Sequence, residues 1–381
     1  MLKRLRNLCF DERGMSFAFV GIGLMTFMAA TALAVDVGMF MTARTQAQTS
    51  ADSAALAGVT ALVYNSWTDR TTAGPAVQSA MSAAAQNTVM GGAVSVQPTD
   101  VTFPNDPSGQ PNRVKVDVYR TAGRSNPVST LLGSLLGRST IDIAATATAE
   151  AAPAGGMSCV KPFIIPDKWQ ELTSPPWNMN TSVYEHYDNH GNELAVHDVY
   201  SSSSGYTADD RGTLLILRAG QGNNIQPTFY FSWAMPPDTG ADWYQQNIAT
   251  CNTTVIDTGY TATQEPGNMQ GPTIAGLEAL KAQDPTAFWD PMAMNGKGDY
   301  VSNIRPSPRV FPIPLYDPEE YDKAVHSGRN ATLVVVKWLG FFLEDIQGNE
   351  AYGRIFPITG VTAATTPSTT TPLAYVIRLV Q

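Results

Sequence analysis

The chain opens with an apolar stretch that carries no charged residue over residues 15–35. At 1.5 Å per residue, a helix of this length spans roughly 30 Å, the thickness of the hydrocarbon core of a bilayer. The helical pattern then continues without a turn signal as an alanine-rich segment to residue 62. The pattern therefore predicts a transmembrane helix over residues 15–35 that extends into a helical stalk.

Small residues recur at every fourth position along this predicted helix, which places each set on a single face. The first stripe is Ala30, Ala34 and Gly38, and the second is Ala43, Ala47, Ala51 and Ala55. Small side chains let another helix approach closely, so both stripes are candidate helix-packing surfaces. For the second stripe, packing on the protein's own globular body is an equal alternative.

After the stalk, the spacing of apolar residues changes from that of a helix to that of strands. Apolar residues alternate with polar ones at 94–103, 113–119 and 139–151, the pattern of half-buried antiparallel strands. Helical spacing at 76–90 and 127–136 interrupts these strands. Residues 36–151 are therefore predicted to form the stalk and a small α+β module with a pilin-like plan.

Small and structure-breaking residues at 152–156 predict a domain boundary. Beyond it, residues 157–381 contain short apolar runs between long turns and one predicted helix at 273–282. The fold class is thus α+β, with a mostly-β extracytoplasmic domain at the C-terminal end. Its last strand, at 373–380, is expected to pair back into a sheet.

The charge pattern orients the predicted span. Residues 1–14 form a short tail in which Lys3, Arg4, Arg6 and Arg13 outnumber the acids, and the positive-inside rule places this tail in the cytoplasm. The remainder is acidic, since the whole chain has a net charge of -9. This balance argues against nucleic acid as a partner.

Several motifs around the span resemble a known family. Glu12-Arg13-Gly14, AVDVG at 34–38, Arg44 and QTSADSAALAG at 48–58 resemble the N-terminal signature of TadE-like and TadG-like proteins of the bacterial Flp (tight-adherence, Tad) pilus machinery. The resemblance implies an inner-membrane protein, or one embedded in a pilus assembly, with its body in the periplasm. We therefore expect a single-pass, non-enzymatic component of pilus biogenesis with other assembly proteins or pilins as partners. A homo- or hetero-oligomer through the N-terminal helix is a candidate assembly.

Two forms of processing compete with a retained anchor. Ala32-Leu33-Ala34 offers a signal-peptidase site after a basic region, although the helical pattern runs through it. Pilin-like cleavage after Gly14 would require an acid at the fifth position beyond the cut, and that position is Phe19. The sequence therefore favours an uncleaved anchor.

Two of the three cysteines lie beyond the span. Cys159 and Cys251 would be in an oxidising compartment, where they are expected to form a disulfide, while Cys9 would be cytoplasmic. Two unpaired buried thiols are the alternative.

Three histidines, His186, His190 and His197, fall close together beside Asp188 and Asp198. Their spacing matches no recognised metal motif, so a hairpin loop with exposed polar residues is preferred, and a metal site is the alternative. No cofactor is expected.

Catalytic motifs are absent from the sequence, which contains no G-x-S-x-G, H-E-x-x-H, phosphate loop or dinucleotide fingerprint. The six tryptophans within residues 157–381 could form a binding face, but most are expected in the core. The alternatives to pilus assembly are a surface or pilus-tip adhesin that binds glycan or a host surface, and a membrane-tethered envelope hydrolase.

Overall fold

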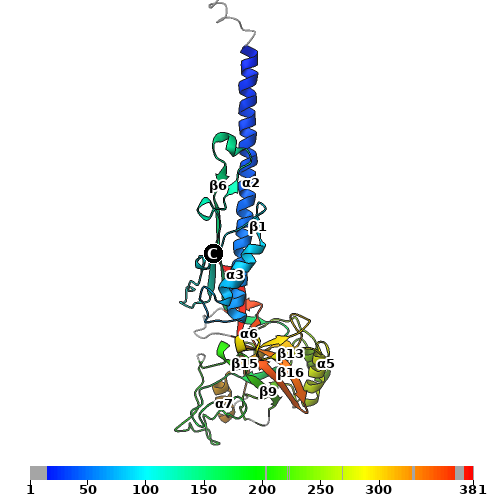
Figure 1. The fold of residues 1–381 in the computed structure, drawn as a ribbon. Helices are drawn as coiled ribbons and strands as arrows, with labels where there is room; N and C mark the ends of the chain where they lie inside the picture. The colour runs from blue at the N-terminus through cyan, green and yellow to red at the C-terminus, as the bar shows by residue number, and fades with distance from the viewer. Residues whose placement is uncertain are drawn as a thin grey trace, which may run out of the picture.

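The computed structural model describes residues 15–201, 204–220, 222, 224–267, 269–327, 331–364 and 373–380. The predicted cytoplasmic tail, residues 1–14, lies outside this range. A single long helix projects from a body made mainly of strands (Figure 1). This arrangement agrees with the predicted apolar N-terminal helix followed by a mostly-β body.

The long helix is α2, which runs from Met15–Tyr64 and contains 50 residues. A helix of this length measures about 75 Å. Its C-terminal half packs against helix α3 (Pro75–Gln86) and a sheet, whereas its N-terminal half extends beyond the body (Figure 1).

The sheet beside α2 has the strand order β18-β20-β7-β4-β3, and two further short strands, β11 and β19, pair with β7. All pairs are antiparallel except β18 with β20. The bounds are β3 (Val101–Thr102), β4 (Arg113–Arg120), β7 (Ile143–Met157), β11 (Ile256–Asp257), β18 (Ile358–Thr359), β19 (Thr362–Ala363) and β20 (Ala374–Val380). The predicted strand at 113–119 is confirmed, and its alternate residues Val114, Val116 and Val118 are fully buried against α2.

Residues 152–156, where the sequence predicts a domain boundary, continue strand β7. Gly155 and Gly156 are needed there for close approach. A Cβ on Gly155 would lie 2.9 Å from the carbonyl oxygen of Ala363, and one on Gly156 would lie 2.3 Å from the Asp257 carboxylate. These glycines therefore let β11 and β19 approach β7, and the sheet joins residues from both sides of the expected boundary.

Two other local predictions are wrong in part. The strand expected at 94–103 is reduced to β3, because Pro98 begins the 3-10 helix η2 (Pro98–Asp100). The helix expected at 127–136 is instead strand β5 (Val128–Ser129) followed by the 3-10 helix η4 (Gly133–Leu136). Strand β6 (Thr140–Ile141) pairs with β5 and completes a hairpin that lies beside α2 (Figure 1).

The second large sheet closes on itself. Its strand order is β12-β16-β15-β8-β10-β9-β17, and β17 also pairs with β16, so six strands form a ring. The bounds are β8 (Phe163–Pro166), β9 (Leu214–Ala219), β10 (Phe229–Ser232), β12 (Thr261–Ala262), β15 (Val310–Tyr316), β16 (Leu333–Gln347) and β17 (Glu350–Ile355). Alternate residues Phe311, Ile313 and Leu315 enter the apolar core of this barrel.

The remaining elements are short helices, 3-10 turns and hairpins, some of which pack on the barrel while others, such as the β1–β2 hairpin, lie beside α2. Tyr244 and Ile248 of one helix and Leu277 and Leu280 of another pack on the barrel core. These helices are α4 (Ala241–Ala249) and α5 (Gln270–Ala282); the others are α6 (Ala293–Gly296) and α7 (Pro318–His326), with 3-10 turns η3 (Ala122–Arg124) and η5 (Ala208–Asp210). Two hairpins pair β1 (Thr88–Val89) with β2 (Gly92–Ala93), and β13 (Phe288–Asp290) with β14 (Asp299–Val301). Helix α5 confirms the helix predicted at 273–282.

Candidate membrane anchor and docking helix

The N-terminal half of α2 presents an apolar surface that the rest of the protein does not cover. Every side chain from residue 16 to residue 35 is exposed except that of Ala32, and the exposed fraction reaches 85% for Phe17 and 76% for Met25. Soluble proteins rarely expose so continuous an apolar surface. By its length and composition the helix is able to cross a membrane.

Asp36, the first charged residue after the apolar span, anchors the β5–β6 hairpin to α2. Its carboxylate is 5% exposed and accepts hydrogen bonds from the backbone N–H groups of Leu131, at 3.0 Å, and Leu132, at 3.2 Å. A buried carboxylate needs such donors to compensate for the lost water. The hairpin tip is thereby held level with the end of the span. Asp36 belongs to the AVDVG motif at 34–38, but its hydrogen bonds to residues 131 and 132 were not predicted, although its position directly after the apolar run is a visible signal.

The two stripes of small residues have different environments. Ala43, Ala47, Ala51 and Ala55 are at most 1% exposed and belong to the core between α2, α3 and the sheet, so the second stripe packs on the protein's own body. Ala30, Ala34 and Gly38 are exposed, and a Cβ added to Gly38 would meet no atom within 4 Å.

The exposed stripe faces away from the body. Side chains two positions apart on a helix point about 200° apart. Ala34 and Gly38 each lie two positions from Asp36, so they point almost opposite to it. Asp36 and the second stripe define the side of α2 that the protein covers itself. The first stripe therefore remains free for contact with another helix.

The C-terminal end of α2 is fixed to the barrel by Arg211. Its guanidinium donates hydrogen bonds to the carbonyl oxygens of Tyr64 and Gly298 and lies 5.1 Å from the ring centre of Phe356. A cation at a helix C-terminus also interacts favourably with the helix dipole. This joint lies far from Tyr64 in sequence, and no sequence pattern identified Arg211.

Comparison with protein-family models gives one match. Residues 14–61 match the family described as "Putative Flp pilus-assembly TadE/G-like". The N-terminal segment of this chain is TadE/G-like. The match ends three residues before the end of α2, so it covers the helix and not the β-rich body. No curated protein and no solved structure matches the chain.

The TadE/G-like segment supports involvement in Flp pilus assembly and association with its machinery. Together with the exposed apolar half of α2, it indicates a membrane-anchored protein. The resemblance noted in the sequence is therefore confirmed for the N-terminal segment.

Beyond the TadE/G-like helix, the predicted disulfide is present. Cys159 and Cys251 are bonded, with a Cα–Cα distance of 4.3 Å. The bond links the residues just after β7 to the loop that follows α4, and the backbone N–H of Cys159 donates to the carbonyl oxygen of Asn252 at 2.8 Å. It therefore ties the end of β7 to the helical edge of the barrel.

The tryptophans of the body are mostly interior, as predicted. Trp169, Trp233, Trp289 and Trp338 are between 0% and 8% exposed, and Trp243 donates a hydrogen bond to the carbonyl oxygen of Met235. They fill the core and its edges, so these rings do not form an exposed aromatic face.

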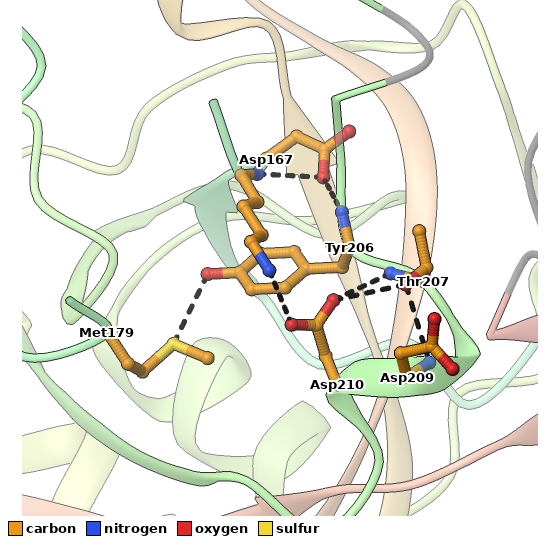
Figure 2. Close-up of polar contacts among 7 residues, drawn as sticks. Asp167, Met179, Tyr206, Thr207, Asp209 and Asp210 are labelled. Atoms are coloured by element: carbon orange, nitrogen blue, oxygen red, sulfur yellow. Dashed lines mark hydrogen bonds and ion pairs between the residues drawn. The ribbon is translucent and has the colours of Figure 1, made fainter. Parts of the chain in front are cut away.

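The buried carboxylate of Asp167 could suggest an active site, but its neighbours use all of its hydrogen-bonding capacity. It accepts hydrogen bonds from the backbone N–H groups of Tyr206 (Figure 2) and Lys168, at 2.9 Å each, and from the Tyr200 hydroxyl, at 3.0 Å. Lys337 forms an ion pair with it at 2.9 Å. Burial and this carboxylate raise the pKa of Tyr200 and Tyr206, so both phenols stay neutral. The network is structural.

The histidine segment forms a hairpin, as predicted, but its polar residues are not all exposed. Tyr187 bridges to Glu193 across the hairpin, and the Asp188 carboxylate accepts backbone hydrogen bonds within the turn. The fold brings His186 and His197 together, with ring centres 4.2 Å apart, whereas His190 lies exposed at the turn. Against expectation, His186 is 7% exposed.

Proposed function

We propose that this protein is a non-enzymatic, single-pass inner-membrane component of Flp pilus assembly. In this proposal residues 15–35 cross the membrane, the first small-residue stripe docks on the single-span helix of another assembly protein or pilin, and the β-rich body lies in the periplasm. The observation that carries it is the TadE/G-like helix, whose apolar half is exposed while its alanine-rich half is buried in the protein itself.

Three features support the orientation. The basic residues before the span favour the cytoplasmic side. The Cys159–Cys251 disulfide is of the kind that persists in an oxidising compartment such as the periplasm. Leu131, on the hairpin tip that Asp36 holds at the end of the span, is 63% exposed, as suits a residue at the membrane surface.

The arrangement of residues 36–151, a long helix packed on an antiparallel sheet, resembles that of a pilin. A long helix whose C-terminal half packs on an antiparallel sheet leaves its N-terminal half free to insert between other helices. Subunits of one type or of two types could associate in this way through the stripe Ala30, Ala34 and Gly38. Retention of the uncleaved helix is part of the proposal.

The cleft beside the α2–barrel joint gives no support to the hydrolase alternative. Its volume is about 610 Å³. Among its described lining residues there is no histidine or lysine to act as a general base, and Asp299 is paired with Arg305 at 3.6 Å. The adhesin alternative loses its main motivation, because the tryptophans are largely buried.

Site-specific photocrosslinking in cells tests the docking face. A photoreactive residue at position 34 should give adducts with another single-span protein of the pilus machinery. The matched control is position 29, an exposed alanine about 140° away on the same helix, which should give none. Equal crosslinking from both positions, or none from position 34, would contradict the docking face. Recovery of the protein in sheared pili rather than in the inner membrane would favour the adhesin.

A further inference from the structure

We propose that His186, Glu193 and His197 form a zinc site on the hairpin of residues 185–198. The Nε2 atoms of His186 and His197 lie 3.8 Å and 3.5 Å from the same oxygen, Oε1 of Glu193. One ligand atom from each residue lies within 4.8 Å of the others. Two imidazoles and one carboxylate are a ligand set typical of zinc with an open fourth position.

In both histidines Nδ1 faces a hydrogen-bond partner, which leaves Nε2 for the metal. Nδ1 of His197 is 2.9 Å from the carbonyl oxygen of Leu194, which can only accept, so in the neutral ring Nδ1 carries the proton and Nε2 keeps its lone pair. Nδ1 of His186 is 3.3 Å from the Tyr184 hydroxyl, which is able to accept a hydrogen bond. Zinc-binding histidines commonly donate their second N–H to such a carbonyl or other acceptor.

The hairpin holds these residues before any metal binds. The backbone N–H of Leu194 donates to the carbonyl oxygen of His186 at 3.0 Å, which places Glu193 opposite His186 and Tyr187. The base of the hairpin is fixed by Asp198, which is fully buried and accepts from the backbone N–H of Glu185 at 2.9 Å. The ring of His186 is also stacked between those of Tyr187 and His197.

Binding zinc requires Glu193 to approach and one imidazole to turn, because the stacked rings of His186 and His197, whose planes are 28° apart, do not point both Nε2 lone pairs at one ion. With bonds of roughly 2.0–2.1 Å in a tetrahedral site, the ligand atoms would lie about 3.3 Å apart. The separations found here exceed this by at most about 1.5 Å. Glu193 has an exposed side chain (61%) that is able to swing toward both rings. Its exposure also leaves room for water or an external ligand at the fourth position.

This inference is independent of the proposed function, since the hairpin lies in the β-rich body and not in the TadE/G-like helix. Hydrogen bonds within the body, rather than contacts with the anchor, hold the three ligands. Bound zinc would link the two segments of this hairpin through their side chains.

Titration of the full chain with Zn²⁺ tests the proposal. The protein would be purified in detergent with a histidine-free tag, treated with a chelator and studied by calorimetry and X-ray absorption. We expect one Zn²⁺ per chain with two imidazole nitrogens in its shell. His197→Ala should weaken binding at least tenfold. Glu193→Gln, an exposed position where folding is not at risk, should also weaken it.

The matched control is His190→Ala, which removes a histidine from the same hairpin outside the cluster. It should leave the affinity unchanged. The proposal is overturned if no Zn²⁺ binds at micromolar concentrations, or if the bound Zn²⁺ is lost in His190→Ala but kept in His197→Ala and Glu193→Gln. Circular dichroism of each variant separates loss of ligands from loss of fold.

Discussion

Lys161 is a buried amine whose titration should make the stability of the protein depend on pH. It is 2% exposed, and its Nζ donates to the carbonyl oxygens of Thr250, at 2.7 Å, and Asn247, at 3.4 Å. It also lies 5.6 Å from the ring centre of Phe311. These groups offer no full negative charge, so burial lowers the pKa of Lys161 from 10.5 to about 7.

The sign follows from proton linkage. Between pH 7 and 10.5 the unfolded chain holds a proton on this amine that the folded chain has largely released. The free energy of unfolding therefore rises with pH across this window. The penalty for burying the charge is fully present below pH 7 and disappears as the pH approaches 10.5.

The magnitude comes from the two pKa values. A difference between 10.5 and about 7 corresponds to a penalty on the order of 4–5 kcal/mol at about 1.36 kcal/mol per unit. From pH 7 to 9.5 the gain should be about 3 kcal/mol. Lys161→Met removes this titration, so its stability advantage over the native chain should be largest at pH 7 and shrink as the pH rises.

Denaturant unfolding of the full chain in detergent, followed by tryptophan fluorescence at several pH values, measures this difference. Lys323→Met is the matched control, because it makes the same substitution at a lysine exposed on α7. The reasoning is refuted if the native chain and Lys161→Met gain the same stability between pH 7 and 9.5.

Three further predictions concern the helix and its joints. Ala51→Leu should lower the free energy of unfolding by about 1–3 kcal/mol, because Ala51 is fully buried, whereas exposed Ala34→Leu should not; equal thermal midpoints would contradict this. Arg211→Ala should cost roughly 2–3 kcal/mol and speed hydrogen exchange at the end of α2, and unchanged protection there would argue against the joint. Deleting residues 374–381 removes β20, including Tyr375 stacked on Trp67, and should make β7 sensitive to limited proteolysis; native resistance would show that β20 is dispensable.

Two helices of the body, α4 and α7, were not predicted from the sequence. Helix α7 has a clear start signal, because Asp317 accepts hydrogen bonds from the backbone N–H groups of Glu319 and Glu320, and Pro318 follows directly. Helix α4 is short and begins without a side-chain cap, so its polar sequence gave little indication. Both helices lie in segments that composition alone assigned to turns.

The cluster of His186, Glu193 and His197 could not be predicted from residue spacing. The spacing of His186 and His197 matches no metal motif, because the hairpin turn between them, not a regular helix or strand period, sets their distance. Glu193 and His197 lie four residues apart on the return segment of the hairpin, and His186 lies on its first segment. Such a cluster becomes visible only after the register of the two hairpin strands is known.

The sequence by itself determined the features that depend on local order: the apolar span, the helix through residue 62, the alternation in β4 and the expectation that Cys159 and Cys251 would pair. Tertiary structure alone decided which stripe of α2 is covered, that residues 152–156 continue strand β7, and that the second sheet closes into a barrel. The physical reason is that periodicity marks which side chains avoid water, but not which distant segment covers them. That choice depends on the packing of strands such as β7 and β20, which lie more than 200 residues apart in the chain.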